Sequence, residues 1–221
     1  MKKDLKLELR KQYYEFLDAK DRVDRDMINE CVYNYDQSKI DYNGKICLDL
    51  GANIGGFVKV ALDRGASHVI AVECDIRNFE KMANSFASED RVTLIYGAIS
   101  NSEESTIKLY KSNSQQNHCT TTIIKRNIFK KYDEVPNIKI QEVLKFNPEI
   151  VKIDIEGAEY QIIDDLLKYL PNILFIELHC GTVKKYTKPT IEKLHNCYPN
   201  SNIKERIVYG SISSYDCLFI K

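Results

Sequence analysis

The chain has 221 residues, 43% of them hydrophobic, and its 32 basic and 32 acidic residues give a formal net charge of +0. This length suits one α/β domain with a small attachment. The balanced charge argues against a protein that binds nucleic acid through bulk electrostatic attraction. No apolar run approaches the roughly 18 residues of a membrane span, so we expect no membrane partner.

The cysteine content indicates a reducing compartment. The chain holds seven cysteines, an odd number, and no Cys-x-x-Cys pair. Free thiols of this kind are typical of cytoplasmic proteins. The first residues alternate charged and apolar side chains and lack the apolar core of a signal peptide, which also predicts a cytoplasmic protein.

The first forty residues are helical in character. Apolar residues recur at three- and four-residue steps in two segments, residues 5–17 and 22–35, which is the spacing of amphipathic helices. We therefore divide the chain into an N-terminal helical cap or arm, residues 1–40, and a main domain, residues 41–221. The cap is expected to pack on the edge of the main domain. The alternatives are a lid over the active site and a dimerisation arm, which would make the protein a homodimer.

Residues 46–57 (ICLDLGANIGGF) carry the first informative motif. An apolar strand, a glycine-rich turn and the start of a helix follow one another, as in nucleotide-binding α/β domains. Gly51 and Gly55 are four residues apart, whereas a dinucleotide fingerprint has Gly-x-Gly-x-x-Gly. The carboxylate of Asp49 ahead of the loop repels phosphate and suits a cationic or hydroxyl-rich ligand. With Asn53 these residues form an Asp-x-Gly-x-Asn-x-Gly pattern that resembles motif I of class I S-adenosylmethionine (SAM) methyltransferases, where the loop would hold the methionine part of SAM.

The next two strands carry further candidate cofactor-binding residues. Residues 68–75 (HVIAVECD) predict a buried strand with acidic residues at its end. Glu73 lies about 20 residues beyond the glycine loop, where a carboxylate accepts hydrogen bonds from ribose hydroxyls, and Cys74 follows it. A third strand then runs into a Gly97-Ala98 turn, whose backbone is expected to line the adenine.

Residues 111–138 show the least regular pattern, after an expected edge strand at residues 105–110. A loop of this length in a compact domain is functional or mobile. We interpret it as an acceptor-binding loop, and the alternative is a plain surface excursion. Four basic residues in it could contact phosphate: Lys125, Arg126, Lys130 and Lys131.

Residues 150–159 (IVKIDIEGAE) form the second informative motif, in which an apolar strand ends at Asp154 and a helix is expected to follow. Another apolar strand, residues 172–179 (NILFIELH), ends with Glu177 and His179. Parallel strands bring their carboxyl ends to one edge of a sheet, so Asp154 and Glu177 are expected at neighbouring strand ends. Such acids transfer protons or hold a divalent ion such as Mg²⁺. His179 could act as a base near neutral pH.

The C-terminal segment predicts the end of the sheet. Residues 188–198 indicate a last helix with Pro189 in its first turn. Two strands, residues 203–209 and 215–220, are joined by a turn rich in serine and predict an antiparallel hairpin. A hairpin of this kind usually ends a class I methyltransferase sheet, and it separates that topology from a dehydrogenase.

Four segments together resemble the FkbM family of SAM-dependent methyltransferases. They are LDLGANIG at 48–55, VIAVECDIRNFE at 69–80, VKIDIEGAE at 151–159 and FIELH at 175–179. The resemblance implies an α/β, Rossmann-like class I methyltransferase fold: a mostly parallel seven-stranded sheet with a C-terminal antiparallel hairpin and helices on both faces. It also implies SAM as the cofactor. A proline commonly follows the acid where Cys74 stands here, a difference of turn that leaves cofactor binding intact.

The resemblance further implies O-methylation of a hydroxyl on a sugar, glycan or small molecule. We predict direct transfer, with Asp154 beside the sulfonium of SAM and with Glu177 or His179 helping it to orient or deprotonate the acceptor oxygen. A divalent ion held by Asp154 and Glu177 is a secondary hypothesis. Two alternatives stay open. One is an RNA (cap) ribose methyltransferase, for which no convincing Lys-Asp-Lys-Glu tetrad is found, and the other is a catalytically inactive scaffold subunit.

Overall fold

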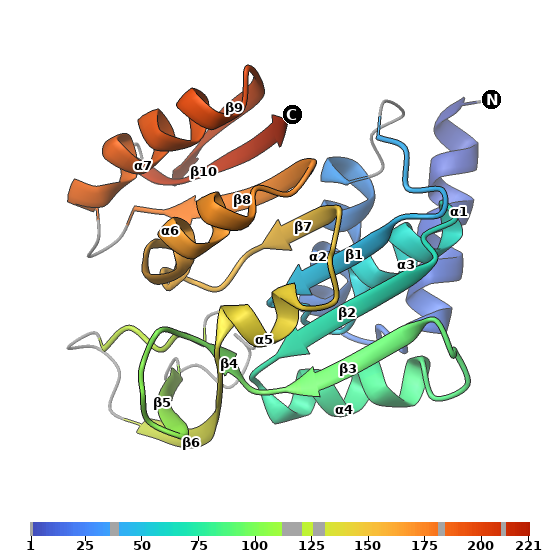
Figure 1. Cartoon of the computed structure of the whole chain (residues 1–221). Coiled ribbons are helices and arrows are strands. Elements are labelled where there is room, and N and C mark those ends of the chain that lie inside the picture. Colours follow the sequence, from blue (N-terminus) through green and yellow to red (C-terminus); the bar gives the residue numbers. More distant parts are fainter. Residues whose placement is uncertain (1, 36–39, 112–120, 126–130, 181–183, 209–210) are drawn as a thin grey trace.

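The computed structural model describes residues 2–35, 40–111, 121–125, 131–180, 184–208 and 211–221 (Figure 1). Strands and helices alternate over much of this length, as they do in βαβ units. In chain order the elements are α1 (Lys2–Phe16), α2 (Arg22–Asn34), β1 (Ile46–Leu50), α3 (Gly56–Asp63), β2 (His68–Glu73), α4 (Ile76–Ser85), β3 (Val92–Tyr96), β4 (Ala98–Ile99), β5 (Thr106–Lys111), β6 (Lys131–Ile138), α5 (Ile140–Leu144), β7 (Ile150–Ile153), α6 (Glu159–Tyr169), β8 (Ile173–His179), α7 (Lys184–Cys197), β9 (Asn200–Val208) and β10 (Ser211–Ile220).

Seven strands form one sheet in the order β3-β2-β1-β7-β8-β10-β9. Strand β10 runs antiparallel to both of its neighbours, β8 and β9, and the remaining pairs are parallel. The predicted fold is therefore confirmed, including the C-terminal antiparallel hairpin. The strand order reverses between β1 and β7, and ligands bind outside the carboxyl ends of the strands at such a switch point.

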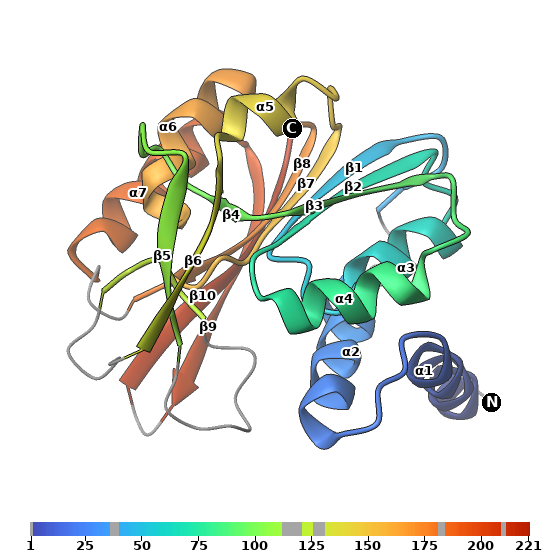
Figure 2. The same cartoon turned by 90° about the horizontal axis from the view of Figure 1, so that it is seen from below.

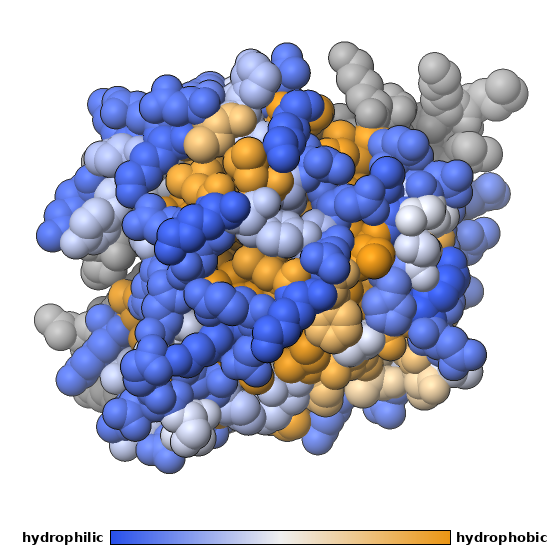
Figure 3. Space-filling view, viewed as in Figure 1, coloured by the Kyte–Doolittle hydropathy of each residue, from blue (hydrophilic) through white to orange (hydrophobic). Residues whose placement is uncertain are grey.

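Helices cover both faces of this sheet. Figure 2 shows α1 to α4 on one face and α5 to α7 on the other. Successive strand residues point to opposite faces: Cys47 of β1 joins the buried cluster that contains Phe57 of α3, and Leu48 joins the cluster that contains Ile162 of α6. Burial on both faces explains why the central strands are nearly continuous apolar runs. On the surface in Figure 3, hydrophilic side chains predominate and apolar ones gather near the centre, over the middle of the sheet.

The N-terminal helices expected from the sequence are present and lie on the α3 side of the sheet. The rings of Tyr35, which caps α2, and Phe57 meet edge to face with their centroids 5.3 Å apart. Helix α2 comes so close to the start of α3 that a Cβ at Gly56 would lie 2.8 Å from the Sγ of Cys31. The division into a cap and a main domain stays a prediction. In the described part of the chain, no helix has the length and apolar character needed to cross a membrane.

Residues beyond β3 build a second sheet of three strands, in the order β4-β6-β5. The expected edge strand is present as β5, but it belongs to this small sheet. The loop predicted over residues 111–138 is wrong in its last part, because residues 131–138 form β6, which pairs antiparallel with β5 and parallel with β4. The sequence pattern misses β6 because Val135 is its one buried residue and Pro136 interrupts it.

Helix α7 differs from the prediction, and helix α5 is one that the sequence pattern does not predict. Helix α7 begins at Lys184, so Pro189 lies inside it and not in its first turn. Helix α5 has only five residues, which is too short for a helical period to show in the sequence. Two members of the basic cluster, Arg126 and Lys130, lie outside the described residues.

Candidate active site

A pocket of ≈ 340 Å³ lies at the carboxyl ends of β1, β2, β7 and β8. The strand order brings these four ends together although they are far apart in the chain. Most of the predicted site residues line the pocket: Gly51, Asn53, Glu73, Cys74, Gly97, Ala98, Asp154, Glu177 and His179. The two other predicted residues, Asp49 and Gly55, are not among the lining residues.

The glycine loop after β1 passes very close to the end of β7. Gly51 has a φ of 79°, and a Cβ at this position would lie 1.9 Å from the backbone oxygen of Asp154. No residue with a side chain fits there, so Gly51 lets the loop backbone and the β7 end share one wall of the pocket. Gly55 serves packing instead, because a Cβ on it would lie 2.5 Å from the Phe86 ring.

Asp49 does not face the pocket as the sequence motif predicts. It is completely buried, and one of its carboxylate oxygens lies 3.1 Å from the Nζ of Lys152. The two residues are direct partners in the β1–β7 register. Lys152 also donates a hydrogen bond of 2.6 Å to the backbone oxygen of Gly51. Burial opposes the charge of Lys152, but Asp49 and Asp154 outweigh it and raise the pKa of the ammonium group.

Lys152 lines the pocket, and the motif analysis misses it. A sequence signal for it exists, since one acid and one lysine each interrupt an otherwise apolar strand. Buried charges of opposite sign pair with each other, because an unpaired buried charge is costly. Asp49 therefore acts on the glycine loop through Lys152.

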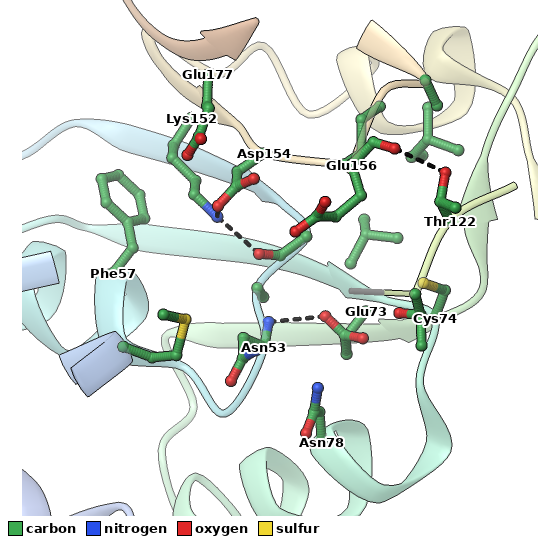
Figure 4. A pocket seen from close by; sticks show the side chains of 18 of the residues that line it. Asn53, Phe57, Glu73, Cys74, Asn78, Thr122, Lys152, Asp154, Glu156 and Glu177 are labelled. Atoms are coloured by element: carbon green, nitrogen blue, oxygen red, sulfur yellow. Dashed lines mark hydrogen bonds and ion pairs between the residues drawn. The ribbon is translucent and has the colours of Figure 1, made fainter. Parts of the chain in front are cut away.

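Glu73 organises the end of the pocket nearest the glycine loop (Figure 4). Its carboxylate accepts backbone N–H hydrogen bonds from Asn53 and Asp75, both at 2.7 Å. Burial raises the pKa of Glu73 to about 7, although both backbone hydrogen bonds oppose this shift. Figure 4 shows Cys74 and Asn78 on the same side of the pocket. The sequence motifs do not single out Asn78.

The opposite end gathers acidic side chains around His179. Asp154 follows β7 and Glu177 lies near the end of β8, so the register confirms that they sit at neighbouring strand ends. The Nε2 of His179 lies 3.5 Å from Glu177 Oε1 and 3.4 Å from Glu156 Oε2. Glu156 lines the pocket and is also missed by the motif analysis, which gives the acid before the glycine no role. Figure 4 shows Asp154, Glu156 and Glu177 on the side away from Glu73.

These groups have unusual proton affinities. Burial raises the pKa of Glu156 to about 8, and burial together with Asp154 raises that of Glu177 to about 7. Burial opposes the charged form of His179, but a hydrogen bond to Glu159 and the surrounding carboxylates outweigh it and raise its pKa to about 11. His179 is therefore cationic near pH 7 and donates hydrogen bonds. A cationic ring cannot accept a proton, so the role of base predicted for His179 is better suited to a carboxylate that titrates near neutral pH.

The donor atoms at this end do not fit a divalent ion well. In the predicted ligand pair, Glu177 already accepts a hydrogen bond from Ser214 at 2.6 Å and lies 3.6 Å from the guanidinium of Arg206. Among the described residues two groups of three have ligand atoms within 4.8 Å of one another: Glu30, Glu177 and Asp216, and Asp154, Glu156 and His179. Arg206 already forms ion pairs with all three acids of the first group. A cationic histidine has no lone pair to offer a metal.

Helix α2 forms one wall of the pocket and is joined to the C-terminal hairpin. Glu30 and Cys31 of α2 both line the pocket. The guanidinium of Arg206, on β9, forms ion pairs with Glu30 and, at 3.2 Å, with Asp216 of β10. Helix α2 therefore contributes residues to the pocket, whereas the predicted roles of the N-terminal helices as a cap, a lid or a dimerisation arm stay predictions.

A short described segment of the predicted acceptor loop also reaches the pocket. Thr121, Thr122 and Ile123 are lining residues. Thr122 exchanges two backbone hydrogen bonds with Tyr110 of β5, and its hydroxyl donates to the backbone oxygen of Glu156 at 2.6 Å. The segment therefore connects the small sheet to the acidic end of the pocket.

A family model for the methyltransferase FkbM domain matches residues 49–197. The chain belongs to the FkbM family of methyltransferases. The family uses SAM as methyl donor, so the predicted family and the general class of reaction are confirmed. The matched region contains every predicted site residue.

Two individual proteins are similar to parts of the chain. The crystal structure of an FkbM methyltransferase from Methylobacillus flagellatus KT has a TM-score of 0.51 at 17% identity, and it covers 82% of this chain and 44% of that chain. This likeness concerns the fold. The 16S/23S rRNA (cytidine-2'-O)-methyltransferase TlyA of Mycobacterium tuberculosis is 42% identical over 52 residues, which are 24% of this chain and 18% of TlyA. The chain therefore corresponds to less than half of either protein.

The residues around the pocket fit SAM. Glu73 presents a buried carboxylate to the pocket, which suits the ribose hydroxyls, and the backbone of Gly51 lines the pocket beside the end of β7. The start of α3 adds the partial positive charge of a helix N-terminus, which suits a carboxylate such as that of the methionine part. The acidic end suits a sulfonium, because carboxylates attract positive charge.

Proposed function

We propose that the protein transfers a methyl group from SAM to a hydroxyl oxygen of a sugar, glycan or other small-molecule acceptor. The observation that carries this proposal is the continuity of the pocket, which joins Glu73 at one end to Asp154 and Glu177 at the other. A group that binds ribose and groups that accept a proton thus face one space, as transfer to a hydroxyl requires. We also propose that the reaction takes place in the cytoplasm, which the free state of the six described cysteines supports.

Each end of the pocket has its own task in this mechanism. When bound, SAM supplies a methyl group activated by the adjacent sulfonium. Glu73 binds the ribose hydroxyls, and the loop at Gly51 binds the methionine part. Asp154 orients the acceptor hydroxyl. Glu177 removes the hydroxyl proton as the oxygen gains the methyl group, because its pKa of about 7 lets it accept a proton near neutral pH.

The charges at the acidic end favour a particular kind of acceptor. Four acidic and two basic side chains line this end: Glu30, Asp154, Glu156, Glu177, His179 and Arg206. The raised pKa values of Glu156 and Glu177 leave these two carboxyls partly protonated near pH 7, so His179 and Arg206 balance most of the remaining negative charge. An acceptor without a strong charge near the reacting hydroxyl disturbs this balance least, which supports a neutral hydroxyl compound.

RNA ribose methylation is a second candidate, which the match to TlyA favours. TlyA is named for methylation of a cytidine 2'-oxygen in ribosomal RNA. The described members of the basic cluster, Lys125 and Lys131, are exposed and could contact an RNA backbone. A scaffold without catalytic activity is the third candidate, and it predicts no transfer by the protein alone.

The deciding experiment incubates the protein with methyl-labelled SAM and cell extract, followed by separation of RNA, protein, glycan and small-molecule fractions. Asp154→Asn is run in parallel, with Asp164→Asn as the matched control because Asp164 is an exposed acid on α6. We expect label in the glycan or small-molecule fraction, unchanged with Asp164→Asn and reduced about 10²-fold or more with Asp154→Asn. Label in RNA would favour the second candidate. Absence of label from every fraction, with S-adenosylhomocysteine still bound, would favour the scaffold.

The predicted divalent ion is tested in the same assay. We expect turnover to survive a chelator, because Glu177 is engaged by Ser214 and Arg206. Loss of activity that Mg²⁺ or Mn²⁺ restores would revive the hypothesis of a metal held by Asp154 and Glu177.

A further inference from the structure

Glu159, the first residue of α6, lies directly behind His179. Its side chain is completely buried, and it is not among the residues that line the pocket. One carboxylate oxygen, Oε1, lies 3.0 Å from the Nδ1 of His179. The same oxygen accepts backbone N–H groups from Ile155 at 3.2 Å and Gly157 at 3.1 Å. The second oxygen, Oε2, has no hydrogen-bond partner among the described residues.

The backbone before α6 is shaped around this carboxylate. Glu156 and Gly157 have φ values of 56° and 102°, in the left-handed region. A non-glycine residue in that region is strained unless its surroundings hold it there. Here the turn directs the N–H groups on both sides of Glu156 toward Glu159. It also places the Glu156 carboxylate on the opposite side of the His179 ring, 3.4 Å from Nε2.

The contacts decide which ring nitrogen of His179 is available. Glu159 Oε1 already accepts two backbone N–H groups, so it is an acceptor toward the ring as well, and Nδ1 carries a proton. The Nδ1–H group therefore donates to Glu159 inside the protein and does not face the pocket. Nε2 is directed to the pocket side, where Glu156 and Glu177 lie within 3.5 Å.

Resting on the proposed methyl transfer, we propose that Glu159 is a positioning residue for His179: it holds the ring so that the Nε2–H group points at the acceptor oxygen. The carboxylate acts through the histidine and does not touch the acceptor. The buried negative charge of Glu159 stabilises the cationic ring of His179. A cationic ring donates a stronger hydrogen bond than a neutral one. The raised pKa of His179 agrees with this arrangement.

A purely structural role accounts for only part of these contacts. Glu159 shapes the turn through Ile155 and Gly157, and a neutral amide oxygen could accept the same two hydrogen bonds. A buried carboxylate with one unpartnered oxygen is costly, whereas burying an amide costs less. The charge therefore needs a second partner to offset it, and His179 is the cationic group within reach. The other acids around the ring are Asp154, Glu156 and Glu177.

The test compares Glu159→Gln with the unchanged protein by NMR of protein labelled with ¹⁵N-histidine, loaded with S-adenosylhomocysteine. The chain has only four histidines, so a His179→Asn sample assigns the signal. In the unchanged protein we expect both ring nitrogens of His179 to be protonated at pH 7.5 and Nδ1–H to exchange slowly with water. In Glu159→Gln we expect faster exchange and a protonation midpoint at least about two pH units lower.

Kinetics give the second readout. We expect Glu159→Gln to lower kcat about 10- to 100-fold and to leave the affinity for S-adenosylhomocysteine nearly unchanged. The melting temperature should fall moderately, because the folded protein binds the His179 proton less tightly. The matched control is Glu192→Gln, because Glu192 is an exposed glutamate of α7. If Glu159→Gln does not fold, Glu159→Asp replaces it. Asp keeps the negative charge, but its side chain is one carbon shorter, so the carboxylate lies farther from His179 Nδ1. The Nδ1–H exchange should therefore again be faster.

The outcomes separate this proposal from the proposed function. Unchanged His179 signals in Glu159→Gln would overturn the positioning role whatever the activity. A loss of folding stability and cofactor affinity with unchanged His179 signals would identify a structural residue. Changed His179 signals in a protein that transfers no methyl group would uphold the Glu159–His179 link and overturn only the proposed transfer.

Discussion

The backbone N–H of Asn53 donates to the carboxylate of Glu73 at 2.7 Å, which joins the glycine loop after β1 to the end of β2. The other oxygen of Glu73 accepts the N–H of Asp75, the residue that caps α4. One buried carboxylate therefore organises two turns at the cofactor end of the pocket. Its protonation state should control how well the pocket binds a ribose.

We predict that affinity for S-adenosylhomocysteine falls at acid pH. Burial raises the pKa of Glu73 to about 7, against the opposing effect of the backbone hydrogen bonds from Asp75 and Asn53, so the carboxylate that ribose hydroxyls need is lost as pH falls through 7. The dissociation constant at pH 5.5 should be about ten- to thirtyfold higher than at pH 8. Isothermal titration calorimetry measures this, and Glu73→Gln should flatten the dependence.

In the ligand-free protein, the contribution of Glu73 to folding stability should change with pH in the opposite direction to the cofactor affinity. Because the pKa of Glu73 in the folded protein lies above its ordinary value of about 4.5, the native state holds a proton that the unfolded state has released between about pH 4.5 and 7. The contribution of Glu73 to the free energy of unfolding therefore increases as pH falls through this window. An unfolding midpoint that is more sensitive to pH in Glu73→Gln than in the unchanged protein would contradict this assignment.

Gly51→Ala should separate a steric role from ordinary glycine flexibility. A Cβ at Gly51 would lie 1.9 Å from the backbone oxygen of Asp154, whereas nothing lies within 4 Å of a Cβ at Gly44. Both glycines have positive φ, so Gly44→Ala is the matched control and should cost about 1–2 kcal/mol. Gly51→Ala should cost more than about 3 kcal/mol and weaken cofactor binding. Urea unfolding of both variants measures the difference, and equal costs would disprove the close contact.

Lys152→Met should be strongly destabilising because it leaves Asp49 as an unpaired buried charge. We expect a loss of about 3–5 kcal/mol in the free energy of unfolding. Adding Asp49→Asn to Lys152→Met should recover part of it, with a coupling energy of about 1–3 kcal/mol in a double-mutant cycle. Strictly additive effects of the two substitutions would show that the 3.1 Å contact between them is unimportant.

Arg206→Met should affect the acceptor more than the fold. The guanidinium joins Glu30 of α2 to Glu177 and Asp216, but about a third of the Arg206 side chain is exposed to solvent. Solvent screens such pairs, so the stability loss should be only about 1 kcal/mol. We expect the acceptor KM to rise while the affinity for S-adenosylhomocysteine stays the same. A weaker cofactor affinity with an unchanged acceptor KM would contradict this role and would indicate that Arg206 supports the cofactor end of the pocket.

Local patterns in the sequence determined much of this protein. The strand, glycine turn and helix at residues 46–57 follow from apolar runs and turn residues that lie next to one another in the chain. The acids at Glu73, Asp154 and Glu177 were predictable because strand ends in this fold share one edge of the sheet. The family could be identified from the same motifs.

Tertiary structure alone decided how these residues act. The pairing of Asp49 with Lys152 depends on β1 lying beside β7, a crossover that no local pattern reveals. The approach of Glu159 to His179 depends on the turn before α6, and the contact of Glu30 with Arg206 joins residues 176 positions apart. The burial of a side chain and the charges around it depend on neighbours in space. The sequence therefore predicted most of the residues of the site, whereas their pairing and proton affinities depend on the tertiary structure.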